Sequence, residues 1–331
     1  LLHRRIMSSG YGLRPDPTLG AIASGIDIAC WDIVGKETGR SIADLLGGRV
    51  HDRLRTYTYL YPTDDLPDVY GDPGDAAARA AQEAALGFTA VKFDPAGPYT
   101  VMGGHQPTQE WLARSESFVR QIRSAVGDRA DLLFGTHGQF TPGGAGRLAR
   151  VLEPYDPLWF EEPVPPDDVA GMASVAASTS VPIATGERLT TKYEFARVLE
   201  ARAASILQPN LGRAGGLLEG KKIAALAEAF GAQIAPHCYN GPIGLAANIQ
   251  LAAASPNFLV LETIGVCDGF HAELLRSPIE WSDGRVIVPN APGLGIELDE
   301  DVARAHPYEG DSLHLTMWSD PIDRATFDAR D

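Results

Sequence analysis

Short apolar runs separated by helical patterns recur along the chain from residue 54 onward. Eight of them have the length and composition of buried strands: Leu54–Tyr57, Phe88–Phe93, Leu132–Phe134, Leu158–Phe160, Pro182–Thr185, Ser205–Leu207, Gln233–Ala235 and Phe258–Leu261. Strands that alternate with helices predict a parallel sheet, and about eight such strands predict closure into a (β/α) barrel. An open doubly wound sheet is the alternative, but no G-x-G-x-x-G sequence follows a strand.

Several intervals between these runs carry apolar residues at helical spacing. The stripes are Val119, Ile122 and Val126; Phe195, Val198 and Leu199; and Ile223, Leu226, Ala227 and Phe230. Gly127 and Gly231 follow the first and the third stripe, and each predicts the end of a helix. The interval Asp94–Glu110 is unusually long and rich in glycine and proline, which predicts an active-site loop, with a plain surface excursion as the alternative.

Two segments flank the barrel pattern. The segment before residue 53 has a helical pattern around Ile26–Val34. The tail after residue 276, with Pro292-Gly293-Leu294-Gly295, has the pattern of a partly extended return. We expect the two segments to pack together as a second domain beside the barrel.

Composition and charge narrow the classes of function. Hydrophobic residues make up 44% of the chain and charged residues 21%, which is typical of a globular protein. The net charge of -15 argues against nucleic acid and anionic membranes as partners, although a bound cation would still allow an anionic small substrate. No signal-peptide pattern and no run of about 18 apolar residues is seen. With three distant cysteines, Cys30, Cys238 and Cys267, these features predict a cytoplasmic protein without a disulfide framework.

Polar residues follow seven strand-like runs in succession. They are Lys92 and Asp94; Thr136, His137 and Gln139; Glu161 and Glu162; Glu187 and Arg188; Gln208 and Asn210; His237; and Glu262. In a parallel barrel the carboxyl ends of all strands meet on one face, where catalytic residues lie. Burying so many ionisable groups without a function would cost several kcal/mol for each unpaired group. The pattern therefore predicts an active site on this face.

The residue types predict acid–base chemistry beside a divalent cation. Glu161 and Glu187 follow adjacent strands and supply the hard oxygen ligands that Mg²⁺ prefers. His137 and His237 follow strands on opposite sides of the barrel, so one can act as base and the other as acid. Each of these four residues has a structural alternative, namely a paired or core side chain. Cys238 is interpreted as packing, because no partner stands at metal-ligand spacing.

Several motifs together resemble the enolase superfamily, in its mandelate racemase-like branch. They are Ser24-Gly25-Ile26-Asp27-Ile28-Ala29-Cys30-Trp31-Asp32, Leu45-Leu46-Gly47-Gly48, Trp159-Phe160-Glu161-Glu162-Pro163, Ala184-Thr185-Gly186-Glu187-Arg188, Gln208-Pro209-Asn210 and Ile234-Ala235-Pro236-His237-Cys238 with Gly241-Pro242-Ile243. The His137-Gly138 pair and the stretch around His237 are most similar to acid-sugar dehydratases of the galactonate type.

The resemblance implies a (β/α)7β barrel with an α+β capping domain. Residues 1–52 would be a remnant of the N-terminal capping domain, whose first strands would precede residue 1. Residues 53–275 would form the barrel, and residues 276–331 would return to the cap. The family's sites hold Mg²⁺ through carboxylates after strands three, four and five. They use a histidine base after strand seven, here His237, and a histidine acid after strand three, here His137.

Three departures from the family pattern change what we expect. Gly135 stands where the first metal carboxylate would be, so Mg²⁺ binding should be weak unless His137 or Asp94 replaces it as a third ligand. The Lys-x-Lys pattern after strand two is Lys92-Phe93-Asp94, so a lysine base is not expected there. Asn210 replaces the aspartate that usually partners the histidine base, which should leave His237 a weaker base.

The sequence thus predicts a sugar-acid dehydratase-like lyase that forms a 2-keto-3-deoxy acid. His237 would remove the proton next to the substrate carboxylate, and His137 would protonate the departing β-hydroxyl. Lys92 would help to stabilise the ene-diolate, and Glu262 would hydrogen-bond the substrate or the intermediate. Racemisation, epimerisation or lactone cycloisomerisation through the same intermediate is one alternative, and a ligand-binding barrel without turnover is another. A homo-oligomer is expected.

Overall fold

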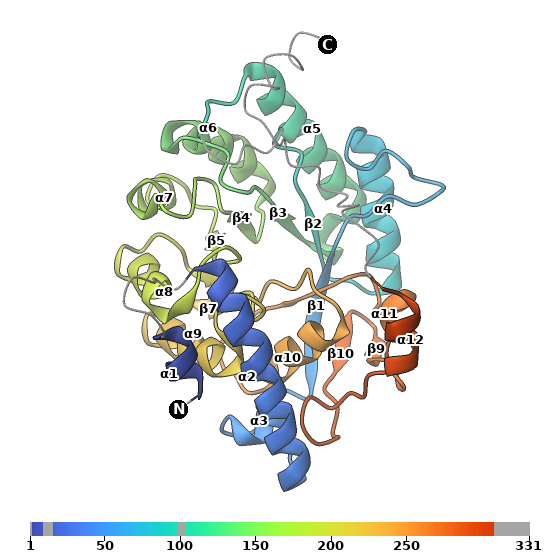
Figure 1. Ribbon diagram of the computed structural model, residues 1–331. Helices are drawn as coiled ribbons and strands as arrows, with labels where there is room; N and C mark the ends of the chain where they lie inside the picture. The colour runs from blue at the N-terminus through green and yellow to red at the C-terminus, as the bar shows by residue number, and fades with distance from the viewer. Residues whose placement is uncertain (1, 9–15, 98–103, 308–331) are drawn as a thin grey trace.

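Eight parallel strands form the centre of the computed structural model, which describes residues 2–8, 16–97 and 104–307 (Figure 1). Consecutive strands are neighbours from β1 to β7, and β8 pairs with β1. The strands are β1 (Arg53–Tyr59), β2 (Ala90–Phe93), β3 (Asp131–Phe134), β4 (Trp159–Glu161), β5 (Ile183–Thr185), β6 (Ile206–Leu207), β7 (Gln233–Ile234) and β8 (Leu261–Thr263). The predicted parallel barrel is confirmed. Seven of the eight predicted runs include most of the residues of the observed strand.

The barrel closes between β7 and the residues just before β8. Ile234 bridges Phe258 in a parallel arrangement, and the amide of Leu259 donates to the Ile234 carbonyl at 2.9 Å. The predicted eighth run, Phe258–Leu261, therefore makes the closing contact, while the regular strand begins only at its last residue. Closure leaves no free edge between β7 and β8, so all strand ends face one opening.

Helices cover the outside of the barrel because each buries one apolar stripe against the sheet. They are α4 (Pro73–Leu86), α5 (Gln109–Val126), α6 (Pro142–Leu152), α7 (Val169–Ala176), α8 (Thr191–Glu200), α9 (Gly216–Ala229) and α10 (Pro242–Ala253), with single 3₁₀ turns at Gly127–Arg129 and Glu153–Tyr155. The predicted stripe in α5 is buried, and Gly127 ends the helix with a positive φ of 56°. Phe230 was wrongly placed in a buried stripe: it lies just after α9 and is 53% exposed, because the helix ends before it.

The interior of the barrel is filled by one layer of side chains from alternating positions of the strands. Its buried members are Tyr57, Ala90, Leu133, Trp159, Ala184, Ile206, Ala235 and Val260. Tyr57 and Trp159 meet edge to face, with ring centroids 5.4 Å apart. This apolar layer forms the floor beneath the polar residues at the carboxyl ends of the strands.

The long interval Asp94–Glu110 is described only in part, since residues 98–103 lie outside the described chain. Its returning end is paired with the loop after β3: the His105 amide donates to the Gln139 carbonyl at 2.9 Å. The described end of the interval therefore lies beside the segment that carries His137. Its role as an active-site loop stays a prediction.

The N-terminal segment lies across the helices on one side of the barrel (Figure 1). It contains α1 (Leu2–Met7), α2 (Pro17–Thr38) and α3 (Ile42–Leu45). The amides of Gly215 and Leu218 donate to Ser24 Oγ and Asp27 Oδ2, which fixes α2 to the start of α9. Among the described helices, α2 is long and apolar enough to cross a membrane by length and composition alone, but it carries the buried polar side chains Ser24 and Asp27, which bond to the start of α9.

The C-terminal segment returns to both the barrel and α2. It contains α11 (Phe270–Glu273), the hairpin of β9 (Trp281–Ser282) and β10 (Arg285–Ile287), and α12 (Glu300–Ala305). β10 pairs antiparallel with the first residues of β1. The Leu294 amide donates to Asp32 Oδ1 at 2.8 Å, and the Gly293 carbonyl accepts from the Ile42 amide. The expected contact between the two flanking segments is therefore present, while the domain boundaries after residues 52 and 275 stay a prediction.

Gly293 is required at this contact. Its φ is 69°, and an added Cβ would lie 2.2 Å from Asp32 Oδ1. We expect Gly293→Ala to lower the free energy of unfolding by about 3 kcal/mol, from backbone strain and overpacking together. Chemical denaturation measures this loss.

Gly39→Ala is the matched control for Gly293→Ala. Gly39 has nearly the same φ, 67°, but nothing lies within 4 Å of an added Cβ. Its substitution should therefore show only the backbone term, about 1 kcal/mol. Equal losses in the two variants would contradict the importance of the contact with Asp32.

Candidate active site

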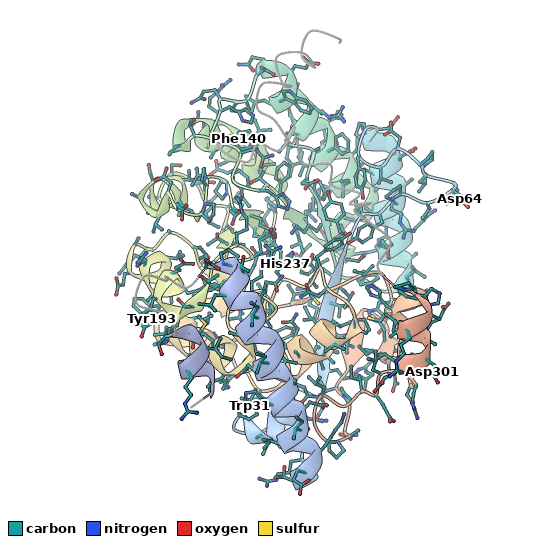
Figure 2. All side chains as sticks on the ribbon, in the orientation of Figure 1. Trp31, Asp64, Phe140, Tyr193, His237 and Asp301 are labelled. Atoms are coloured by element: carbon teal, nitrogen blue, oxygen red, sulfur yellow. The ribbon has the colours of Figure 1, made fainter. Side chains whose placement is uncertain are left out.

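The polar residues predicted from the strand ends meet at the carboxyl ends of the barrel strands. Figure 2 shows His237 near the middle of the molecule. The buried members of the group are Lys92, Thr136, Gln139, Glu161, Glu162, Glu187, Gln208, Asn210, His237 and Glu262. His137 is half-buried and lies on the same face, within 4.0 Å of Glu187.

Lys92 and Glu161 form a buried ion pair at the centre of this face. Lys92 Nζ lies 2.5 Å from Glu161 Oε1, and both side chains are almost fully shielded from solvent. The other oxygen of Glu161 accepts from Trp159 Nε1 at 3.1 Å and from Gln208 Nε2 at 2.8 Å. Burial alone would lower the pKa of Lys92, but Glu161 and the neighbouring carboxylates raise it above its ordinary value. Lys92 is therefore an ammonium ion held in a fixed position.

Gly135 leaves the space that Lys92 and Asp94 occupy. A Cβ added at Gly135 would lie 3.1 Å from Asp94 Cβ and 3.2 Å from Lys92 Cε. Lys92, in β2, and Asp94, just after this strand, thus lie next to the position where the family pattern has a carboxylate side chain. Lys92 therefore brings a positive charge, and Asp94 a carboxyl group, next to the position of the missing carboxylate.

Glu187 lies between the two histidines. Its Oε2 is 3.3 Å from His237 Nε2, and its Oε1 is 4.0 Å from His137 Nε2. Burial opposes ionisation of Glu187, but the two imidazoles and Lys92 outweigh it and lower the pKa to about 2. The residues after β3 and β7 therefore direct one ring nitrogen each to the same carboxylate, which is ionised at neutral pH.

Asp94 stands beside His137 on the side away from Glu187. Its Oδ1 accepts from the Tyr59 hydroxyl, and its Oδ2 lies 3.7 Å from His137 Nδ1. Burial raises the pKa of Asp94 to about 7. Burial also lowers the pKa of His137 to about 4, so this imidazole is neutral at neutral pH.

His237 has a polar group at each ring nitrogen. Asn210 Nδ2 lies 2.8 Å from His237 Nδ1. On the other side, Glu262 Oε2 lies 3.9 Å from His237 Nε2 and accepts from the Cys238 amide at 2.7 Å. Cys238 is buried, and burial raises the pKa of its thiol to about 12, in agreement with a packing role.

A second ion pair supports the loop that carries His137. Arg188 donates to Glu162 Oε1 from Nε at 2.7 Å and to the His137 carbonyl from a terminal nitrogen at 2.8 Å. Thr136 Oγ1 donates to the Glu162 carbonyl at 2.9 Å. These contacts join the ends of β3, β4 and β5, so the position of His137 depends on residues from three strands.

The described side chains do not fit a Mg²⁺ ion held by three carboxylates. Glu161 is engaged by Lys92, Trp159 and Gln208, and an ammonium ion at this position repels a divalent cation. No carboxylate follows β3, because Gly135 stands there. Across residues 2–8, 16–97 and 104–307, no group of three or more His, Cys, Asp or Glu side chains could hold a metal ion. Glu161 and Glu187 are brought close together by their strands, but as metal ligands they stay a prediction.

Strand β1 contributes two residues that the sequence analysis missed. Tyr59 ends the strand and holds Asp94, while the Tyr57 hydroxyl is buried with no hydrogen-bond partner among the described residues. The predicted ring of polar residues began only after β2. The alternation Tyr57-Thr58-Tyr59 at the end of the first strand was the signal that could have extended it.

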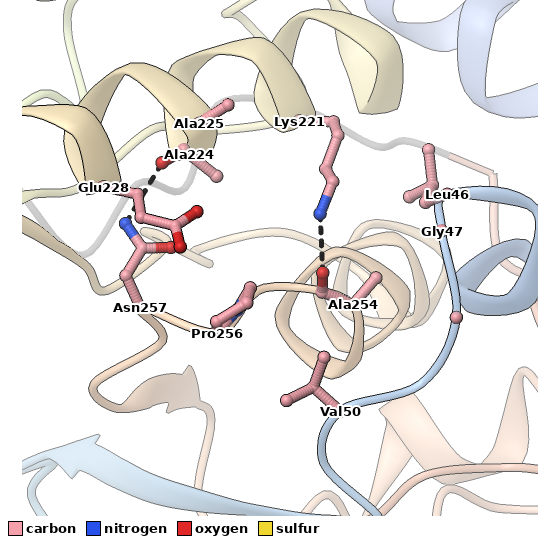
Figure 3. Close-up of a pocket in the computed structure, with 11 residues that line it drawn as sticks. Leu46, Gly47, Val50, Lys221, Ala224, Ala225, Glu228, Ala254, Pro256 and Asn257 are labelled. Carbon is pink, nitrogen blue, oxygen red and sulfur yellow. Dashed lines mark hydrogen bonds between the residues drawn. The ribbon is translucent and has the colours of Figure 1, made fainter.

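Another pocket lies on the opposite side of the barrel, beside the residues that precede β1 and β8 (Figure 3). Its lysine, Lys221, donates to the Ala254 carbonyl, and Asn257 donates to the Ala224 carbonyl. These polar side chains serve backbone groups, and no histidine lines this pocket beside Lys221 and Glu228. The acid–base groups at the carboxyl ends of the strands therefore identify the candidate site.

Comparison with curated proteins gives relatives over most of the chain. The D-xylonate dehydratase of Haloferax volcanii is 37% identical over 92% of this chain and 74% of its own length. The D-galactonate dehydratase of Ralstonia nicotianae is 38% identical over 87% of this chain and 74% of its own. Both relatives carry the names of enzymes that dehydrate sugar acids.

Solved structures agree with this relationship. A crystal structure from Labrenzia alexandrii DFL-11 that carries the mandelate racemase/muconate lactonizing enzyme name is 62% identical, with a TM-score of 0.92, over 96% of this chain and 81% of that one. A mandelate racemase/muconate lactonizing enzyme from Sulfitobacter sp is 55% identical, with the same TM-score and the same coverage. The family described as enolase C-terminal domain-like matches residues 75–302. The chain therefore belongs to the enolase superfamily, as a member that resembles its acid-sugar dehydratases.

Proposed function

We propose that the protein is a sugar-acid dehydratase, a carbon–oxygen lyase that converts its substrate into a 2-keto-3-deoxy acid. The observation that carries the proposal is the convergence of His137 and His237 on the Glu187 carboxylate at the catalytic face of the barrel. Two imidazoles near one buried carboxylate can move protons at neighbouring carbons of a small substrate. The named dehydratase relatives support this chemistry for the chain.

The reaction needs removal of the proton next to the substrate carboxylate and loss of the β-hydroxyl as water. Removing the proton transfers negative charge to the carboxylate, which becomes an ene-diolate. The Lys92 ammonium is positioned before the reaction by Glu161 and lies where that charge can be stabilised without reorganisation. Glu262 lies within 3.9 Å of His237, where its carboxylate can accept a hydrogen bond from a substrate hydroxyl.

The superfamily's Mg²⁺, when bound, supplies Lewis-acid stabilisation of the same negative charge. Here Glu187 and Glu161 would be its ligands, and His137 or Asp94 would have to provide a third. Because Lys92 already neutralises Glu161, we expect only weak binding of the ion. The substrate would be a small anionic sugar acid, while cytoplasmic location and homo-oligomeric state stay predictions.

A screen of sugar acids tests the proposed reaction. Purified protein with millimolar Mg²⁺ should release a 2-keto acid from at least one five- or six-carbon sugar acid. The double variant His137→Asn/His237→Asn is the control, because it removes both imidazoles and should lower turnover by about 10⁴-fold or more. Epimerised or cyclised product would favour the racemase or cycloisomerase alternative. Ligand binding without any product would favour a barrel that lacks turnover.

Titration with Mg²⁺ tests the role of Lys92 at the site. The native protein should bind the ion weakly, with a Kd on the order of 1 mM or higher, because a fixed ammonium offsets one carboxylate. Lys92→Gln removes that charge and should tighten binding at least about tenfold, since close unit charges interact by about 4 kcal/mol at an effective dielectric near 20. Isothermal titration calorimetry measures both constants.

Lys221→Gln is the matched control for the Mg²⁺ titration. Lys221 lies in the pocket of Figure 3 and donates to a backbone carbonyl, so the substitution removes the same charge far from the strand ends. It should leave Mg²⁺ binding unchanged. Micromolar binding by the native protein, or no gain in Lys92→Gln, would show that the ion pair does not oppose the metal.

A further inference from the structure

The catalytic face has two unlike sides. On the side from β2 to β6, polar side chains bond to one another. Arg188 donates to Glu162 Oε1, while Lys92 and Gln208 both donate to Glu161. The other side is formed by the ends of β7, β8 and β1, which are neighbours in the closed ring. Tyrosine side chains gather on this second side.

Tyr61 and Tyr239 come from the two strands next to the one that carries Glu262. Tyr61 follows β1 and Tyr239 follows β7, while Glu262 is in β8 between those strands. Glu262 Oε2 accepts from the Cys238 amide at 2.7 Å, which fixes the carboxylate in place. Burial raises the pKa of the Tyr61 hydroxyl, and Glu262 and Tyr239 raise it further because they lie close to it. The three side chains therefore form one group on this side of the face.

The tyrosine rings on this side are held in place but keep accessible surface. The ring centroid of Tyr59 lies 5.4 Å from that of Tyr61 and 6.0 Å from that of Tyr70. Tyr59 is itself anchored through its hydroxyl to Asp94. Tyr61 is half-buried, whereas Tyr70 is 42% and Tyr239 45% exposed. The rings thus offer a fixed surface that a ligand can contact.

This group matches the chemistry of a hydroxylated carbon chain. Beyond the two reacting carbons, a sugar acid presents C–H and O–H groups in alternation. A tyrosine ring packs against C–H groups, and its hydroxyl exchanges hydrogen bonds with O–H groups. The Glu262 carboxylate accepts such hydrogen bonds, and the Lys92 ammonium attracts the carboxylate end of the same molecule. The side from β2 to β6 offers fewer partners, because its polar groups bond to one another.

We propose that Tyr61 and Tyr239, with Glu262 between them, bind the distal hydroxyl-bearing carbons of the substrate and so select five- or six-carbon sugar acids over shorter hydroxy acids. The inference rests on the proposed function for the identity of the substrate, but selection by chain length is a property of binding alone. The two tyrosines transfer no proton in this role. Their removal therefore weakens binding and raises KM, with little effect on kcat.

Calorimetric titration tests the selection by chain length. The ligands are a panel of six-carbon aldonic acids and D-glycerate, a three-carbon acid with the same carboxylate and neighbouring hydroxyls. The His137→Asn background blocks elimination, so binding is measured without turnover. Tyr61→Leu/Tyr239→Leu should weaken binding of the best six-carbon acid about 30-fold, because two aromatic contacts are lost, and should change D-glycerate binding less than about twofold. Tyr61→Phe/Tyr239→Phe keeps both rings and their packing, and should weaken binding of the six-carbon acid about fivefold.

Tyr193→Leu is the matched control. Tyr193 lies on α8, is 65% exposed and packs against Lys192, so its loss should change the binding of neither acid. Equal weakening for both chain lengths, no weakening in the double leucine variant, or no binding of any six-carbon acid by the unsubstituted site would overturn the inference. With the acid found by the screen, a fall in kcat at unchanged KM would also overturn it. Loss of selectivity in the leucine variant without dehydration by the native protein would refute the proposed function and leave this inference standing.

Discussion

Closure of the eight-stranded ring is the constraint on which the whole site depends. Most strands are only two to four residues long, and their hydrogen bonds to both neighbours set the register of each strand end. The bridge between Ile234 and Phe258 completes the ring. Because all strands run in parallel, seven polar strand ends far apart in sequence reach one face above a single apolar layer. Without closure, His137 and His237, which follow strands separated by three others, would lie far apart across an open sheet.

Charge balance at the centre of that face differs from the arrangement implied by the family pattern. Carboxylates gathered without compensating cations would be costly to bury. The chain compensates with its own residues: Lys92 neutralises Glu161, and Arg188 neutralises Glu162. The loss of a side chain at Gly135 provides the space that Lys92 occupies. The glycine at position 135 and the Lys92–Glu161 ion pair therefore both help to balance the charge of the buried carboxylates.

Asn210 contacts His237 through a different functional group from the aspartate that the family pattern has there. Asparagine and aspartate have nearly the same shape, but one presents an NH₂ donor where the other presents an acceptor. At His237, Asn210 places its Nδ2 2.8 Å from the ring Nδ1.

The sequence by itself determined the barrel, the order of its strands and the identity of nearly all polar residues on the catalytic face. Apolar periodicity and strand-end chemistry are local properties, so they are readable without coordinates. The sequence did not place Phe230 correctly, because where α9 ends depends on its packing. It also did not show that Lys92 reaches Glu161 or that Asn210 turns its NH₂ group to His237. Those outcomes depend on distances of a few ångströms between different strands and on the Gly212 amide, which only the closed tertiary structure brings together.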